Sequence, residues 1–424
     1  MPNQPTREDA AKLFLACRIA IVLAALTLVA PGARADGPEA PMFSFSGFGS
    51  LGLVHSSEHQ ADFISSGLKP NGAGFSHNWS ADVDSLIGAQ VSANLTPELS
   101  AVLQVISEQN YDNTYRPHVE WANIKYAFTP DFSIRAGRIV LPTFLVSDYR
   151  KVGYANTWVR PPVELYSLIP INTSDGLDAS FRLRAGDLTN TVQASYGSAE
   201  PRLPAGGSAK SKDARGISDT VEYGAATLHV SYFKTRLTLE SLNPLFDGFR
   251  QFGPEGVTIA DKYDVNNKDF TFIGLGGMYD PGGWYLIGEW GATDSHSALG
   301  KRSAWYTSGG YRLGKFTPYL IFAQAKADSN TSDPGLNVSA LPAFLAGAAG
   351  ALNAGLNTTL AATPVQKTVS FGGRWDFTRD VDLKLQFDHT RLGDGSPGTL
   401  INTQPGFRPG GTVNVISAVV DFVF

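Results

Sequence analysis

The chain ends in Thr412-Val-Asn-Val-Ile-Ser-Ala-Val-Val-Asp-Phe-Val-Phe424, an alternating run whose last residue is aromatic. In a β-strand, successive side chains point to opposite faces. The apolar side chains that would share one face are Ile416, Ala418, Val420, Phe422 and Phe424. Asp421 would lie on the opposite face. Because about 9–11 tilted strand residues cross the hydrocarbon of a membrane, this run predicts a strand with one lipid-facing side.

The other end of the chain has the pattern of an export signal. An apolar stretch at 19–30 follows three basic residues, Arg7, Lys12 and Arg18. This stretch is too short to span a membrane as a helix. Ala33 and Ala35 then supply small residues where a signal peptidase reads the chain. We therefore predict that residues 1–35 are a cleaved signal peptide and that residues 36–424 form one domain.

Composition excludes several classes of function. The full chain has a formal net charge of −5, which argues against a nucleic-acid partner. Its one cysteine, Cys17, lies in the predicted signal peptide, so a disulfide framework and a cysteine-ligated zinc are not expected. Apart from His55 and His59 in a predicted loop, the seven histidines show no metal-ligand pairing, and the sequence contains no Gly-x-Ser-x-Gly motif. We predict no catalytic residue, metal or cofactor, and hence no enzyme.

The chain also lacks a convincing transmembrane helix. Mean hydropathy is −0.09, and the nearest candidate is the uncharged segment 340–362. Pro342, three glycines and two asparagines weaken that candidate, so we interpret it as a short helix packed in an external loop. A membrane protein without hydrophobic helices must be a β-barrel, because lipid leaves no other way to pair the backbone.

Short turns alternate with long connections along the chain. The short turns are centred at 96–98, 129–131, 186–187, 224–225, 280–283, 314–315 and 378–380. The long connections are expected at 56–77, 110–117, 139–176, 198–216, 240–268, 294–301, 328–365 and 393–411. Seven short turns and eight long loops give about 16 strands, with both termini on the short-turn side.

The predicted strands alternate between polar and apolar residues. In 177–185 and 381–388 one face is apolar and the other carries charge, and 82–93 follows the same pattern. A soluble β-sandwich would have the same period. Aromatic residues gather beside the short turns, as an interfacial girdle predicts. The fold class is therefore an all-β, transmembrane antiparallel β-barrel with short periplasmic turns and long extracellular loops.

That third long loop, 139–176, is the main candidate for function. About 16 strands enclose a lumen too wide for side chains to fill, so solute selection depends on what narrows it. Loops of this length usually need a functional explanation. The charged residues of the loop are Asp148, Arg150, Lys151, Arg160, Glu164 and Asp175. Opposed charges across a pore would bias which ions pass.

The loop follows a predicted fifth strand that ends in Ala136-Gly137-Arg138. This position, the export signal and the terminal Phe424 together resemble the Gram-negative porin superfamily. The resemblance implies a homotrimer in which the third loop folds into the barrel, with its acids facing a basic cluster on the wall. The implied loop acids are Asp148, Glu164 and Asp175, and the implied wall bases are Arg135, Arg182, Arg184, Arg374 and Lys384. Arg138 is assigned to the base of the loop, and Arg150, Lys151 and Arg160 complete the expected pore lining.

The expected function is a water-filled channel in the Gram-negative outer membrane for passive diffusion of small hydrophilic solutes and ions. Its expected partners are outer-membrane lipid, those solutes and further copies of the chain. One alternative is a substrate-specific channel for a carboxylate or sugar. Others are a barrel adhesin and an enzyme on the barrel rim. The ion preference stays open, because lumen acids such as Asp82, Asp84 and Asp178 compete with the bases.

Overall fold

The computed structural model describes residues 41–393 and 395–424. Sixteen long strands make up most of this part of the chain. They are β1 (Phe43–Ser56), β5 (Leu86–Asn94), β6 (Leu99–Glu108), β7 (His118–Thr129), β8 (Phe132–Val140), β9 (Thr173–Ala185), β10 (Leu188–Ala199), β11 (Ala209–Tyr223), β12 (Ala226–Leu239), β13 (Lys268–Tyr279), β14 (Trp284–Ser295), β15 (Lys301–Tyr311), β16 (Phe316–Ala327), β17 (Gln366–Thr378), β18 (Val381–Leu392) and β19 (Thr412–Val423). Three two-residue strands lie in the first long loop: β2 (Asp62–Phe63), β3 (Ala73–Gly74) and β4 (Trp79–Ser80).

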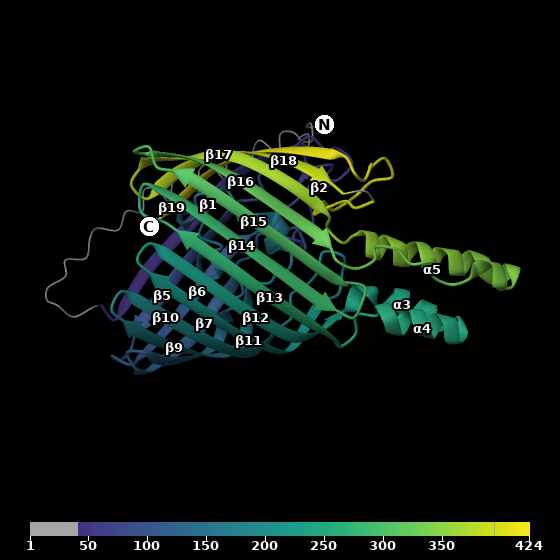
Figure 1. The fold of residues 1–424 in the computed structure, drawn as a ribbon, viewed down its shortest axis with the longest axis horizontal. Helices are drawn as coiled ribbons and strands as arrows, with labels where there is room; N and C mark the ends of the chain where they lie inside the picture. The colour runs from purple at the N-terminus through teal and green to yellow at the C-terminus, as the bar shows by residue number, and fades with distance from the viewer. Residues whose placement is uncertain (1–40, 394) are drawn as a thin grey trace, which may run out of the picture. The chain divides into compact units, whose positions relative to one another are not determined.

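Each long strand pairs antiparallel with the next, and β19 pairs with β1, so the sheet closes into a barrel (Figure 1). Closure leaves no long strand with an unpaired edge, which is what the absence of water in hydrocarbon requires. In the ring, β16 and β17 lie eight positions from β8 and β9, on the opposite side of the interior.

All seven short turns occur where the sequence predicts them, and the long connections alternate with them. The strand number is therefore confirmed. Three boundaries are corrected. The strand predicted at 82–93 begins at Leu86, the loop predicted at 139–176 spans only 141–172, and the loop predicted at 198–216 shrinks to 200–208. In the second and third cases the strands extend further into polar sequence than the alternation suggests, because inward polar residues keep pairing their backbone up to the rim. In the first case the strand is shorter, because residues 82–85 belong to the first long loop.

The two faces of the wall differ in the way a membrane barrel requires. On β18, Lys384 points inward and is fully buried, whereas its neighbour Leu385 points outward and is 56% exposed. On β14, Glu289 is buried between the exposed Leu286 and Trp290 on the other face. The outward apolar residues meet lipid in a membrane, so their exposure is not an aggregation liability.

Four α-helices lie in the loops. They are α2 (Val163–Tyr166), α3 (Asn243–Arg250), α4 (Gly253–Tyr263) and α5 (Ala343–Ala361). Helices α3, α4 and α5 lie at the long-loop end of the barrel (Figure 1), around a small apolar cluster that includes Phe246, Phe249 and Leu356. Helix α5 confirms a helix at the predicted 340–362 segment. Among the described residues, no helix is long and apolar enough to cross a membrane.

The seam between the first and last strands depends on glycine. The Gly47 N–H donates to the Phe424 carbonyl at 2.8 Å, and the Phe424 N–H donates back at 3.0 Å. A Cβ on Gly47 would lie 2.2 Å from the Phe424 ring, and one on Gly49 would lie 2.4 Å from the Phe422 ring. The two terminal rings therefore occupy the space next to Gly47 and Gly49 that side chains on β1 would fill, and they cover the paired backbone.

We predict that Phe424→Ala destabilises the barrel by about 1 kcal/mol, the size of an aromatic cross-strand contact, because the Gly47 backbone loses its cover. The measurement is urea unfolding of the refolded protein in lipid vesicles, followed by tryptophan fluorescence. Phe344→Ala is the matched control, since Phe344 on α5 is 83% exposed. Equal unfolding midpoints for both variants would contradict this role of the terminal ring.

Candidate pore constriction

Residues 141–172, here called the inner segment, leave the wall after β8 and return to it at β9. Their hydrogen bonds reach inward side chains on the opposite side of the ring. Trp158 Nε1 donates to Ser308 Oγ on β15 at 2.8 Å. Lys384 Nζ on β18 donates to the Gly153 carbonyl at 2.7 Å, and Arg374 Nη1 on β17 donates to the Tyr154 carbonyl at 2.6 Å. The inner segment therefore crosses the interior of the barrel.

Arg160 is the most extensively bonded anchor of the inner segment. Its Nε donates to Asp84 Oδ1 at 2.8 Å, Nη1 to Asp388 Oδ2 at 3.3 Å and Nη2 to Ser417 Oγ at 2.6 Å. The Arg160 side chain is only 7% exposed. Removing one partner from a buried ion pair costs about 3–5 kcal/mol, because the other charge is left uncompensated. These contacts join the segment to the first loop, β18 and β19 at one point.

Two buried carboxylates hold the segment from either side. Glu289 on β14 accepts from the Leu145 N–H at 2.7 Å, from Tyr166 Oη at 2.7 Å and from Tyr306 Oη at 2.8 Å. Glu164 of α2 accepts from Gln366 Nε2 at 2.7 Å and also from the Thr368 hydroxyl. Burial raises the pKa of the Glu164 carboxyl, and these two side-chain donors oppose the shift.

Aromatic packing fills the space between the inner segment and this side of the wall. The rings of Phe144 and Tyr166 lie 4.4 Å apart, and Phe144 meets Phe272 of β13 at 5.3 Å. Trp158 meets Tyr306 of β15 edge-on at 5.5 Å. Edge-on and offset aromatic pairs are favourable beyond their buried area. The space between Phe144, Trp158, Tyr166 and these wall aromatics is therefore a packed core.

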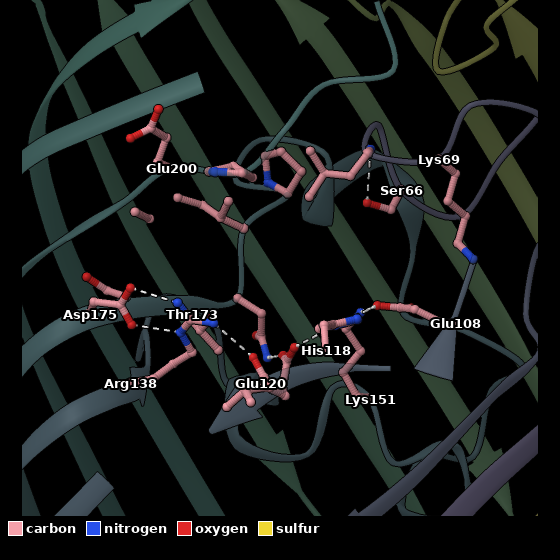
Figure 2. Close-up of a pocket in the computed structure, with 18 of the residues that line it drawn as sticks. Ser66, Lys69, Glu108, His118, Glu120, Arg138, Lys151, Thr173, Asp175 and Glu200 are labelled. Atoms are coloured by element: carbon pink, nitrogen blue, oxygen red, sulfur yellow. Dashed lines mark hydrogen bonds and ion pairs between the residues drawn. The ribbon is translucent and has the colours of Figure 1, made fainter. Parts of the chain in front are cut away.

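The opposite face of the inner segment is open. A first cavity of about 270 Å³ lies between the segment, the first loop and the ends of β6 to β10 (Figure 2). A second cavity of about 100 Å³ lies between the segment, β1 and the first loop. Both are lined by Ser66, Lys69, Glu108, Lys151 and Pro170, so the two are adjacent.

The first cavity carries a network of charges. Lys151 pairs with Glu108, and His118 Nε2 lies 3.8 Å from Glu108 Oε1 and 3.6 Å from Glu120 Oε2. Arg138 Nε donates to Asp175 Oδ1 at 2.7 Å, and Nη2 donates to Oδ2 at 2.8 Å. Figure 2 shows both groups on one side of the cavity. Three bases and four acids line it besides His118.

The second cavity has the opposite balance, with four bases and two acids in its lining. Lys151 is paired with Glu108, and Arg160 with Asp84. Lys69 donates instead to the Asp82 carbonyl at 2.8 Å. Burial lowers the pKa of Lys69, and the Glu108 carboxylate opposes the shift.

Arg150 is the other base of the second cavity whose hydrogen bonds go to backbone. It donates to the Ile169 carbonyl at 3.3 Å and the Tyr166 carbonyl at 3.4 Å, and its guanidinium lies 4.9 Å from the Tyr166 ring centre. Lys69 and Arg150 therefore have no carboxylate partner among the described residues, so the second cavity has an excess of positive charge.

The structure separates the residues that the sequence grouped as pore lining. Five of them line the two cavities: Arg138, Arg150, Lys151, Arg160 and Asp175. Asp175 lies on β9 and not in the loop, which corrects the predicted loop boundary. Glu164, Arg374 and Lys384 are used to anchor the inner segment. Alternation along a strand identifies which side chains point into the barrel. It does not predict which of them a loop will bury.

Four further residues lie away from the cavities. Arg135 forms an ion pair with Asp178 at 2.7 Å. The loop acid Asp148 faces that pair: enclosure raises the pKa of its carboxyl, and Arg135 opposes the shift. Arg184 pairs with Asp131 at 2.7 Å, next to a short turn, and Arg182 is exposed on β9. The implied opposition of loop acid and wall base therefore occurs at Asp148 and Arg135, below the cavities.

Sequence reasoning missed Lys69, Glu108, His118 and Glu120. Glu108 and His118 flank the predicted loop 110–117, so their place on the inward face of a strand near the rim was the available signal. Glu120 lies where the register between β6 and β7 shifts. Because of this register shift, the alternation of the sequence does not show that Glu120 points into the barrel. Lys69 belongs to a long loop whose path the sequence does not define.

Comparison with known proteins gives a clear result for the fold. No protein-family model and no curated protein matches the sequence. Among solved structures, OmpF of Salmonella typhi, in complex with daunomycin, matches at a TM-score of 0.55 and 12% identity, covering 90% of this chain and 97% of that one.

Two other structures give similar results. The outer-membrane channel DcaP of Acinetobacter baumannii matches at a TM-score of 0.53 and 11% identity, with 90% and 97% covered. An anion-selective porin from Comamonas acidovorans matches at 0.52 and 10% identity, with 90% and 99% covered. At these identities the likeness defines architecture, and on that basis the chain has the 16-stranded barrel fold of Gram-negative outer-membrane porins.

Proposed function

We propose that the protein is an outer-membrane diffusion channel and that the inner segment is its constriction. The observation that carries the proposal is the anchoring of the inner segment across the barrel, which leaves two charged cavities along its open face. A wide barrel needs such an element to restrict which solutes pass. Small hydrophilic solutes would pass along the polar side and avoid the aromatic side.

We further propose that the constriction favours anions. The second cavity is the smaller of the two, and it has two bases in excess. In its lining, Glu108 and Asp84 each pair with a base, whereas Lys69 and Arg150 have carbonyl partners. Fixed charge acts most strongly on ions where the passage is narrow and partly dry.

The fold and the outward apolar wall support an outer-membrane location. Export would use the predicted signal peptide, residues 1–35, which lies outside the described residues. The chain would assemble as a homotrimer, as the resemblance to porins implies. The outward faces of β19, β1 and β5 suit a subunit contact, because small and aliphatic residues such as Ala418, Leu51 and Ala89 line them.

A substrate-specific channel is the second candidate. The supporting observation is the separate apolar cavity described below, which a general diffusion pore does not need. The adhesin and rim-enzyme alternatives have no comparable support. An adhesin tolerates a blocked lumen, whereas this interior keeps charged cavities on one face of the inner segment.

The anchoring role predicts the effect of Arg160→Gln. Loss of the guanidinium leaves Asp84 and Asp388 without their shared partner, at a cost of about 3 kcal/mol at the anchor. The inner segment should then detach in part, and single-channel conductance in planar bilayers should rise and become noisier. Arg184→Gln, which breaks an exposed pair, is the control and should conduct like the unchanged protein. Identical traces for the two variants would show that Arg160 does not set the constriction.

The charge of the second cavity predicts a change in selectivity. Two unit charges about 4 Å apart interact by about 1 kcal/mol in water. Replacing both Lys69 and Arg150 with Gln should therefore lower the anion-to-cation permeability ratio severalfold. The ratio is measured from the reversal potential under a KCl gradient. Lys326→Gln is the matched control, because Lys326 is exposed on the outward face of β16. An unchanged ratio in the double variant would refute the assigned charge balance.

A further inference from the structure

A third cavity, of about 210 Å³, lies on the other side of the inner segment from the second. It is bordered by residues 167–171 of the inner segment and by the inward faces of β11, β12 and β13 near their long-loop ends. Its walls are mostly aliphatic and aromatic and include Ile169, Phe233, Leu237 and Phe270. We call it the apolar cavity.

The polar side chains around the apolar cavity are bonded to protein, with one exception. Ser211 Oγ and Thr235 Oγ1 lie 2.7 Å apart and share a hydrogen bond. Ser167 Oγ donates to the Glu164 carbonyl at 3.1 Å. Their hydrogen-bonding capacity is used within the fold, so they place no demand on a ligand.

The exception is Arg302, the only charged residue in the lining. It is the second residue of β15 and lies on the inward face of that strand, as do the buried Ala304 and Tyr306. Its side chain is partly buried, and its Nε is sealed from solvent without a hydrogen-bond partner in the described residues. No ion pair or hydrogen bond joins Arg302 to another side chain described in the structure.

An unpaired guanidinium against apolar walls is unfavourable, because a buried charge is normally paired. A carboxylate is the best complement, since its two oxygens match the planar fork of arginine. The apolar walls require the rest of the ligand to be hydrophobic. A dry cavity of about 150 Å³ holds a benzene molecule, so the apolar cavity has room for a single ring or a short alkyl chain.

The apolar cavity is also reachable from the passage. It shares Leu68, Pro170, Ile171 and Pro201 with the first cavity. The apolar cavity therefore adjoins the first cavity, so a solute in the first cavity lies next to it.

We propose that Arg302 and the apolar cavity form a binding site for an organic carboxylate with a small apolar body. The carboxylate pairs with the guanidinium, and the body packs between Ile169, Phe233 and Leu237. This proposal rests on the proposed function in one respect, namely that the ligand arrives as a solute of the channel. It identifies a substrate class for that channel.

The test uses the mature protein in lipid nanodiscs, so that detergent does not compete for the apolar cavity. Binding of 4-fluorobenzoate is followed by fluorine NMR. We expect saturable binding that weakens at least about tenfold in Arg302→Gln, the effect of losing one charge-assisted hydrogen-bonded pair. Arg182→Gln is the matched control, because Arg182 is also on an inward face but lies far along β9 from this cavity.

Two further probes separate the parts of the site. 4-Fluorobenzyl alcohol keeps the ring without the charge, and fluoroacetate keeps the charge without the ring. Both should bind the unchanged protein at least about tenfold more weakly than 4-fluorobenzoate. Equal binding of the alcohol, equal binding by Arg302→Gln, or no saturable binding by the unchanged protein would each overturn the proposal.

Conductance of the same preparations in planar bilayers tells the two proposals apart. A conducting channel that does not bind 4-fluorobenzoate removes the site and leaves the proposed function intact. Saturable, Arg302-dependent binding by a barrel that does not conduct supports the site and removes the proposed function.

Discussion

The ion pairs of Arg160 with Asp84 and Asp388 tie the inner segment to the first long loop and to the far wall of the barrel. The interior depends on this contact, since a closed sheet of sixteen strands is too wide to fill itself. Burial makes the contact costly to break, because each carboxylate would remain in a poorly solvated place. The contact thereby fixes the inner segment at one position across the lumen, which the strands alone would leave open.

That position divides the interior into two chemically different halves. Towards β13 to β16, Phe144, Trp158 and Tyr166 pack against wall aromatics around the buried Glu289. Towards β1 and β5 to β10, charged side chains border the first and second cavities. The same segment thus provides a hydrophobic core with one face and a hydrophilic lining with the other. The aromatic half supplies packing, and the charged half is where solutes would pass.

The sequence predicted the wall better than the interior. Alternation and turn residues are local signals, so the strands, the seven turns and the place of the third loop follow from them. The last strand is an example, since Asp421 is inward and Phe422 outward as its parity requires. The local sequence pattern does not predict the path that a long loop takes. Lys384 and Arg374 are inward, yet the inner segment covers them, and Lys69 reaches the cavities from another loop altogether.

We propose that the charged half of the interior is the conducting path. The most direct measurement is single-channel recording of the refolded mature protein in a planar bilayer, with the reversal potential taken under a KCl gradient. We expect stable stepwise openings and a reversal potential on the anion-selective side. A barrel that is folded, as judged by its heat-modifiable migration, but passes no current would contradict it.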